Sequence, residues 1–176
     1  MGAEPENVTI PWPLNGTYKI QLIGTADGTY TLNLTLFTNS SASVTQTFTG
    51  TIATGAIYEY TLNISGQTLS AKPNSTDDLK QLKTLINSLL SSVFDDRIMI
   101  ASNLKKALLN KINEVILKVE AGNYTDAINK LLYDIRAKMD GDSTAKDWIT
   151  DQTTQLKLCI IIDHIIESIK ILQENN

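Results

Sequence analysis

Few residues of this sequence have the chemistry that an active site needs, and His164 is the first of them. It is the only histidine among 176 residues, and Asp163 and Glu167 lie close to it along a predicted helix. A histidine beside two carboxylates can bind a metal ion weakly or act as a base. The commoner arrangement is a surface histidine paired with a glutamate one turn away, and we expect this pairing with Glu167. Cys159, the only cysteine, lies about one and a half turns away and is expected to be a small buried hydrophobe.

Two acidic segments have the oxygen atoms that a hard cation requires, since such ions bind several oxygen ligands in a tight turn. The first runs from Asp140 to Asp147. Its spacing does not match an EF-hand, which needs ligands at alternate positions and a closing glutamate, so we predict a helix-capping loop. The second, Asp95-Asp96, is expected to be a polar connector between helices. We therefore predict no metal site, no cofactor and no catalytic residue.

Aromatic side chains are a third chemical resource, because their faces can stack on sugar rings. Most of the tyrosines alternate with polar residues on predicted strands, and we expect them to pack in the core. Trp12 and Trp148 remain as exposed platforms for a carbohydrate ligand.

Seven Asn-X-Ser/Thr sequons mark acceptor sites for N-glycosylation in an exported protein. Six of the seven precede residue 77. Asn33 and Asn63 fall on the outward face of predicted strands whose other face is apolar, where a glycan would not disturb the core. The pattern predicts an extracellular glycoprotein. The seven asparagines are Asn7, Asn15, Asn33, Asn39, Asn63, Asn74 and Asn123.

The composition excludes several classes of protein. Hydrophobic residues make up 42%, which suffices for packed cores, but only 19% are charged, so Thr, Ser and Asn must carry much of the solubility. The net charge of −4 and the absence of a basic cluster argue against a nucleic-acid partner. A single cysteine excludes an internal disulfide. No apolar run of about 20 residues could span a bilayer and no leader is present, so we expect a fragment whose export signal lies upstream.

Up to about Gly66 the sequence alternates between apolar and polar residues, the period of half-buried strands. Strands are predicted at residues 18–22, 30–36, 44–51 and 58–64, and turn residues such as Asn15-Gly16 and Asp27-Gly28 separate them. We predict that residues 1–70 form an antiparallel, Ig-like β-sandwich.

From Asp77 the apolar period becomes helical, and residues 72–76 form the join, with Ser75 or Thr76 capping the next helix. Four amphipathic helices with short connectors predict an antiparallel α-helical bundle over residues 74–176, which makes the chain α+β by segregated modules. The predicted apolar stripes are Leu79, Leu82, Ile86, Leu89, Leu90 and Val93; Leu104, Leu108, Ile112, Val115 and Val119; Tyr124, Ile128, Leu131 and Ile135; and Leu158, Ile162, Ile165, Ile169 and Leu172.

The last helix has apolar residues outside its main stripe, at Leu156, Ile160, Ile161 and Ile171. A helix that is apolar around most of its circumference is normally buried within its domain. The alternative is an interface with another chain, such as a homodimer, because large apolar patches seldom stay exposed on monomers. Both explanations are open at this level.

Two families resemble parts of the chain. Residues Asn15–Leu34, followed by Thr47–Thr51 and Ala56–Leu62, are similar to the small β-sandwich modules found late in long prokaryotic surface proteins. The helical half, above all Val119–Leu131, resembles the FIMAH domain, a helical module of bacterial and archaeal extracellular proteins that include carbohydrate-active enzymes. The resemblance implies a segment of a prokaryotic, archaeal surface protein without catalytic residues.

Two hypotheses about function follow. The first is a non-enzymatic, extracellular structural, adhesion or protein-interaction module pair, in which the sandwich acts as a spacer and the helices contact other domains or another surface protein. The alternative is a carbohydrate-binding appendage of an upstream extracellular enzyme, with Trp12 or Trp148 in the glycan site.

Overall fold

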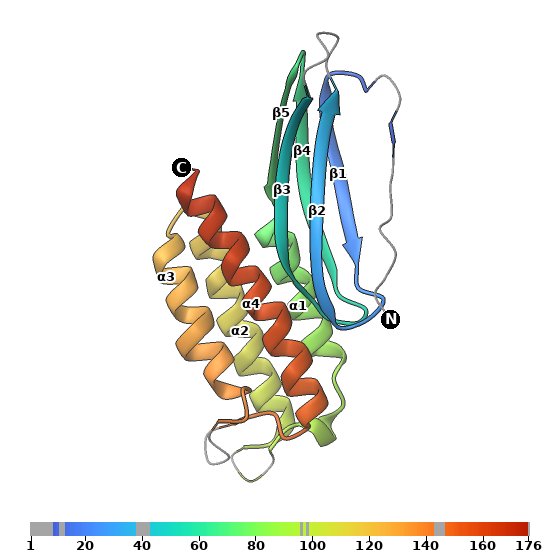
Figure 1. Cartoon of the computed structure of the whole chain (residues 1–176). Coiled ribbons are helices and arrows are strands. Elements are labelled where there is room, and N and C mark those ends of the chain that lie inside the picture. Colours follow the sequence, from blue (N-terminus) through green and yellow to red (C-terminus); the bar gives the residue numbers. More distant parts are fainter. Residues whose placement is uncertain are drawn as a thin grey trace.

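The computed structural model describes residues 9–10, 13–37, 43–95, 97, 99–142 and 147–175. Antiparallel strands occupy the first half of the chain and helices the second, so the α+β class is confirmed. Figure 1 shows the strands as one elongated body lying beside the upper end of the helices. We refer below to the β part, up to Pro73, and to the helical part, from Asn74 onward.

Five strands form two separate antiparallel sheets. One sheet has the order β1-β4-β5 and the other pairs β2 with β3. The four predicted strands are confirmed, whereas β5 was not predicted, although its short sequence alternates between exposed and more buried residues and ends in a proline. Proline is tolerated there because β5 lies at the edge of its sheet. The strands are β1 (Gly16–Ile23), β2 (Gly28–Phe37), β3 (Ser43–Ile52), β4 (Ile57–Ser65) and β5 (Thr68–Pro73).

The two sheets contact each other through specific side chains. The rings of Phe48 on β3 and Tyr60 on β4 lie with their centroids 4.7 Å apart. The side-chain amide of Gln46 on β3 donates to the backbone carbonyl of Ala71 on β5 and accepts from its N–H, each at 2.7 Å. This amide therefore hydrogen-bonds the backbone of an edge strand whose only neighbour in its own sheet is β4.

The helical part begins directly after β5. Asn74 is the N-cap of the first helix, because its Oδ1 accepts from the N–H of Asp77, so the predicted capping by Ser75 or Thr76 is wrong by one or two residues. Short helical turns η1 (Ser91–Val93), η2 (Lys130–Ile135, a π-helix) and η3 (Arg136–Lys138) interrupt the connections. The main helices are α1 (Ser75–Ser88), α2 (Ala101–Glu120), α3 (Tyr124–Asn129) and α4 (Gln152–Glu174).

The predicted apolar stripes are confirmed for α2, whose five residues are all buried, and in part for α1. The first helix ends at Ser88, earlier than expected, and Leu90 is 72% exposed while Val93 lies in η1. The third predicted helix changes into a π-helix after Asn129, although Leu131 and Ile135 are buried as expected. A helical period alone does not show where a helix ends, and the cap of α1 offers no glycine to mark it.

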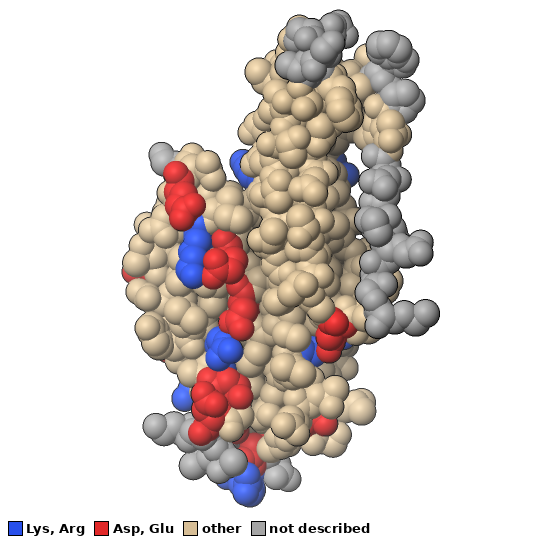
Figure 2. Space-filling model, in the orientation of Figure 1, with Lys and Arg blue, Asp and Glu red and all other residues tan. Residues whose placement is uncertain are grey.

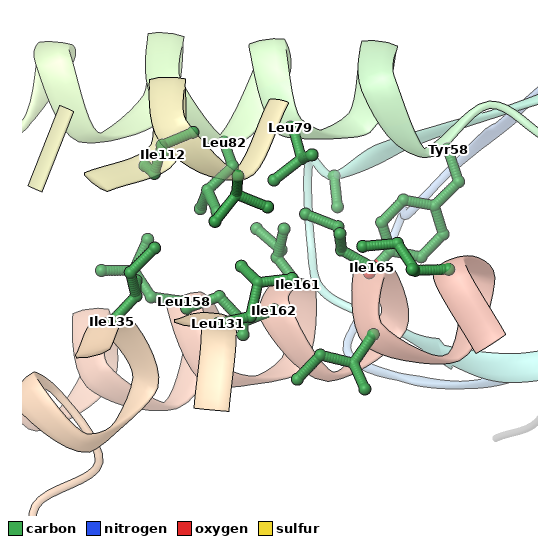
Figure 3. Close-up of a cluster of buried hydrophobic side chains, with 14 of the residues drawn as sticks. Tyr58, Leu79, Leu82, Ile112, Leu131, Ile135, Leu158, Ile161, Ile162 and Ile165 are labelled. Atoms are coloured by element: carbon green, nitrogen blue, oxygen red, sulfur yellow. The ribbon is translucent and has the colours of Figure 1, made fainter. Parts of the chain in front are cut away.

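Helix α4 occupies a central position between the β part and the other helices. It contacts α1 and α3 on one side and β3 and β5 on the other. Figure 3 shows Ile161, Ile162 and Ile165 of α4 pointing into the cluster that they share with other helices and, at one end, with Tyr58 of β4. This position explains why α4 is apolar around most of its circumference.

Of the four apolar residues outside the main stripe of α4, Ile161 is only 5% exposed, which agrees with the explanation that this helix is central. Ile160 and Ile171 are partly buried and pack against the same core. Leu156, at 58% exposed, is the one of the four that lies on the surface. Ile161 is therefore covered within the protein itself, on the side of α4 that faces α1 and the start of β4.

The predicted boundary between residues 70 and 74 falls within β5 and its junction with α1. The buried apolar residues of both halves belong to one continuous cluster. Independent folding of the two halves stays a prediction, and expression of each half will test it. Among the described residues, no helix is long and apolar enough to cross a membrane.

Candidate functional site

Buried polar side chains collect where the sheets meet α1 and α4, and we call this group the junction cluster. His164 is 5% exposed and Asp78 is 1% exposed, so both titratable groups are withdrawn from solvent. Four separate elements contribute, which makes the cluster a link between the β part and the helical part. Its members are Tyr30 (β2), Tyr58 and Tyr60 (β4), Asp78 (α1), and His164 and Ser168 (α4).

The structure corrects the expectation of a surface His164 paired with Glu167. Glu167 is exposed and forms an ion pair with Lys170 at 2.6 Å, whereas His164 points toward the sheets. The reason is the central position of α4, since His164 packs against tyrosines of β2 and β4 and against Asp78 of α1. A period of 3.6 residues cannot distinguish a covered second face from an exposed one.

The His164 ring has a partner at each nitrogen and on one face. Its Nδ1 lies 3.2 Å from the hydroxyl of Tyr30. Its Nε2 lies 3.3 Å from Ser168 Oγ and 3.5 Å from Asp78 Oδ2. The ring of Tyr58 stacks on the imidazole with 3.4 Å between the centroids and 5° between the planes. The imidazole is therefore immobilised by contacts from β2, β4, α1 and its own helix.

Asp78 joins α1 to the neighbouring strand. Its Oδ1 accepts from the backbone N–H of Glu59 on β4 at 3.1 Å. Its Oδ2 makes no hydrogen bond of good geometry within the described residues and has only the nearby His164 nitrogen. Burial raises the pKa of the Asp78 carboxyl, and the contacts with His164 and the Glu59 N–H oppose that rise. The carboxyl group is thus held in an environment that disfavours its charge.

The tyrosines complete the cluster on the sheet side. The hydroxyls of Tyr30 and Tyr60 are 2.7 Å apart and share a hydrogen bond. Burial raises the pKa of Tyr30, Tyr58 and Tyr60 above the ordinary value of a phenol. These hydroxyls stay protonated near neutral pH and do not act as bases there. Their placement in the core was expected from the strand alternation, and it is confirmed for Tyr58 and Tyr60.

The geometry does not match a catalytic triad. In a Ser-His-Asp triad the serine and the carboxylate contact opposite nitrogens of the imidazole, so that the carboxylate orients the base. Here Ser168 and Asp78 both approach Nε2, and a tyrosine occupies Nδ1. Ser168 is 2% exposed and lies one turn from His164 on the same helix. This arrangement stabilises packing and does not present a nucleophile.

A pocket of about 370 Å³ lies beside the cluster, between the start of β4 and helices α1 and α4. Asp78 and Tyr58 belong to its lining, which is otherwise largely apolar, with Leu82, Leu85 and Ile161. Among the described residues, neither the imidazole nor the Ser168 hydroxyl lines it. A molecule in this pocket would therefore meet the carboxylate side of the cluster but not its histidine.

A larger pocket of about 990 Å³ lies near the start of α4 and the turn residues Asp27 and Thr54. Charges of both signs line it. Arg136 donates to Asp163 at 2.8 Å and lies 3.6 Å from Asp140, so Asp163 is engaged away from His164. In the described part of the chain, no group of three His, Cys, Asp or Glu side chains is placed to hold a metal ion.

The remaining predicted site residues lie apart from the junction cluster. Trp148 is half-buried, packs against the core and has Lys138 Nζ 5.9 Å from its ring centroid, so its surface is not an open platform. Asp95 lies in the connection before α2, as expected, but it is buried, and its carboxylate accepts three hydrogen bonds from Arg97, two from the guanidinium and one from the backbone N–H. Trp12, Asp96 and residues 143–146 of the predicted capping loop lie outside the described residues.

Cys159 is buried and free, as predicted. Burial raises the pKa of its thiol to about 11, so the reactive thiolate is scarce at neutral pH. Its Sγ lies 3.7 Å from the backbone carbonyl of Met139. The thiol therefore belongs to the packing of α4 against the loop that precedes it.

The sequons divide by exposure. Asn33 and Asn63 are exposed on the outer faces of their strands, as the alternation predicted, and Asn15 and Asn123 are exposed as well. Asn74 is partly buried and caps α1. Asn7 and Asn39 lie outside the described residues.

Sequence reasoning missed the partners of His164. Neither Asp78, in the first turn of α1, nor Ser168 was singled out. One signal was available, because His164 and Ser168 are polar residues one turn apart within a helix that is apolar around most of its circumference. Polar side chains in such a helix require buried hydrogen-bond partners.

Comparisons of the chain with models of protein families, with curated proteins and with solved structures produced no match.

Proposed function

We propose that this chain is a non-catalytic structural module pair of a larger secreted or cell-surface protein, in which the junction cluster holds a β-sandwich and a helical bundle at a fixed orientation. The carrying observation is that five buried polar side chains and the partly buried Tyr30, from β2, β4, α1 and α4, contact one another across the join. Polar groups buried at such a place have defined partners and angles, and they favour one packing arrangement over alternatives.

Three features support a structural role over an enzymatic one. The only imidazole is closed on both nitrogens and on one face, and it lines neither of the pockets described above. The serine beside it is buried and shares a nitrogen with the carboxylate. The phenols near it are held protonated by burial. Each of these properties is typical of packed side chains inside a protein and disfavours proton transfer to a substrate.

The finer fold assignment belongs to the same proposal. The contact between Phe48 and Tyr60 and the Gln46 bonds to Ala71 join the inner sides of the two sheets, which supports a sandwich related to the Ig-like fold. The contacts of α4 with α1 and α3, and of α2 with α1 and α3, support a bundle of four helices. In this arrangement the β part is a spacer and the outer helices are available to other domains or another surface protein.

The extracellular location is supported by the composition of the β part. Strands β2 and β3 contain no charged residue, and exposed sequons stand on the outer faces of both sheets. The carbohydrate-binding alternative gains no support from Trp148, which is half-buried beneath Lys138. We therefore propose adhesion or protein contact as the role of this segment.

Surface labelling tests the location. Intact cells of the source organism are treated with an amine-reactive biotin that cannot cross membranes, and we expect biotin on exposed lysines of this protein, such as Lys19. A cytosolic protein serves as the control and must stay unlabelled. If the protein is labelled only after lysis, the proposed surface role is refuted.

Unfolding tests the structural role. Near-ultraviolet circular dichroism reports the packed tyrosines of the junction, and far-ultraviolet circular dichroism at 222 nm (about the α-helix minimum) reports the helical part. If the junction cluster holds the β part and the helical part together, both signals should change in one transition with the same midpoint. Two separate midpoints would contradict a joint that holds the two parts together.

A further inference from the structure

Five of the seven sequons lie within the described residues, and they differ in what their side-chain amides do. N-glycosylation joins a sugar to the amide nitrogen of asparagine and leaves the amide carbonyl in place. A sequon therefore suits modification when its carbonyl oxygen is the atom that contacts the protein and its nitrogen is unengaged. We use this criterion to separate the five sites.

Three asparagines of the β part meet the criterion. Asn63 accepts from Thr17 Oγ1 at 2.7 Å, and Asn33 accepts from Thr47 Oγ1 at 2.8 Å. Each of these pairs consists of residues directly opposite each other on neighbouring strands. In all three side chains, no hydrogen bond from Nδ2 is found within the described part of the chain. The third site is Asn15, which accepts from the backbone N–H of Gly66 at 2.7 Å.

Asn74 fails the criterion. Its Nδ2 donates to Asp77 Oδ2 at 2.7 Å, and its Oδ1 accepts from the Asp77 N–H at the start of α1. Two lysines, Lys19 and Lys80, lie 3.6 Å and 3.0 Å from the same Asp77 carboxylate. A sugar on Nδ2 would crowd the Asp77 carboxylate and weaken the cap of α1.

Asn123 meets only the part of the criterion that concerns its amide nitrogen. It stands at the exposed turn between α2 and α3 and makes no side-chain capping bond, although it occupies the N-cap position of α3. A substituent on its amide nitrogen would therefore project from the surface without removing a helix cap.

The outer face of the β2–β3 sheet provides a second, independent reason for a covering group. Thr31, Asn33, Thr35, Thr47 and Thr49 are exposed on it, and both strands lack charge altogether. On the side of the molecule in view, Figure 2 shows few charged side chains on the elongated body of the sheets, while a row of mixed charges runs over the helices. Uncharged, β-branched strands with a free edge pair readily with other chains unless something blocks them.

From these contacts we infer that N-glycans are carried by Asn15, Asn33, Asn63 and Asn123 and that Asn74 is unmodified, so that both outer faces of the β part are covered by sugar. This inference rests on the proposed surface location.

The transfer forms a bond between Nδ2 and the anomeric carbon of an activated sugar, here a lipid-linked glycosyl diphosphate. The bond from that carbon to the diphosphate oxygen breaks, the diphosphate leaves with the electron pair, and one amide proton is lost to base.

Glycopeptide mass spectrometry on the protein purified from the surface fraction tests the assignment. No Lys or Arg lies between Lys19 and Lys72, so trypsin leaves Asn33 and Asn63 on one peptide and chymotrypsin is used to separate them. We expect sugar masses at the four assigned asparagines and a bare Asn74. Bare asparagines at positions 33 and 63, or a glycan on Asn74, would overturn the inference.

Variants distinguish sequon use from other sugar attachment. Thr35→Ala removes the sequon of Asn33 while keeping the asparagine, so the glycan at Asn33 should be lost, and Thr35→Ser should retain it. The matched control is Thr45→Ala, because Thr45 is the cross-strand neighbour of Thr35 and shares a 2.9 Å hydrogen bond with it but belongs to no sequon. Sugar that persists at Asn33 in Thr35→Ala would also overturn the inference.

The same cells, labelled with impermeant biotin, separate the two proposals. A labelled protein with bare asparagines refutes the glycan assignment and leaves the surface role intact. A protein that is labelled only after lysis and carries no sugar refutes both.

Discussion

The replacement His164→Leu tests the junction cluster, because leucine has a similar size and keeps the site apolar while removing both ring nitrogens. The variant loses the stack on Tyr58, the hydrogen bond with Tyr30 and the contact with Ser168. It also leaves the buried Asp78 Oδ2 without the one polar group near it. We expect the folded state to be destabilised even though no cavity is created.

The magnitude follows from these losses. The stack is worth about 1 kcal/mol, each of the two neutral hydrogen bonds about 1 kcal/mol, and the buried oxygen left unpaired about 2 kcal/mol. Burial of the leucine side chain offsets about 2 kcal/mol of this total. The expected loss in the free energy of unfolding is therefore about 3 kcal/mol, which corresponds to a fall in Tm of roughly 10 °C for a chain of this size.

Urea unfolding followed by circular dichroism measures the effect. The matched control is Glu167→Gln on the same helix, which affects an exposed ion pair and should change the free energy of unfolding by less than about 0.5 kcal/mol. A double-mutant cycle with Asp78→Asn shows whether His164 and Asp78 interact, and we expect a coupling of about 1–2 kcal/mol.

Two results would refute the reasoning. If His164→Leu is no more destabilising than Glu167→Gln, the imidazole does not contribute to the joint. If the two substitutions at His164 and Asp78 are strictly additive, the loss reflects general damage to the core and not their contact.

Four further predictions concern other features of the structure. Burial raises the pKa of Asp78 in the folded state, so the stability that this carboxyl contributes is present below its ordinary pKa of 3.8 and is lost as pH rises through the folded pKa. From pH 4 to pH 7, the urea midpoint of Asp78→Asn should therefore fall less than that of the wild type. Gly24→Ala should cost about 2 kcal/mol or more, since its Cβ would meet the carbonyl oxygen of Ala53, whereas Gly28→Ala, with open space around it, should stay within about 0.5 kcal/mol on thermal melting. Cys159 should react with a thiol reagent slowly in buffer and rapidly in urea, and fast labelling of the native protein would contradict its burial. Residues 1–73 and 74–176, expressed separately, should each melt below the intact chain, and equal melting points would show that the shared face of α4 contributes nothing.

The sequence by itself was sufficient to predict strands and helices from the spacing of their apolar residues. Alternation over Tyr30–Leu36 and Tyr58–Ile64 predicted strands with a buried face, and the spacing of Leu104, Leu108 and Ile112 predicted a buried stripe on α2. These patterns are local, because a strand repeats every two residues and a helix every 3.6, so the side of each element that avoids water can be found without knowing its neighbour. The exposure of Asn33 and Asn63 followed from the same alternation.

The tertiary structure alone decided which elements meet. The sequence does not encode locally that β1 pairs with β4, that β5 completes that sheet, or that β3 and β5 cover the second face of α4. His164 shows the consequence, since its neighbours Asp163 and Glu167 suggested a solvated helix face, while Tyr30 is 134 residues away in the chain and Asp78 belongs to another helix. The charge environment of a side chain depends on distances in space. For His164 those distances are set by the packing of the sheets against α4, and this packing cannot be predicted from the periodicity of the sequence.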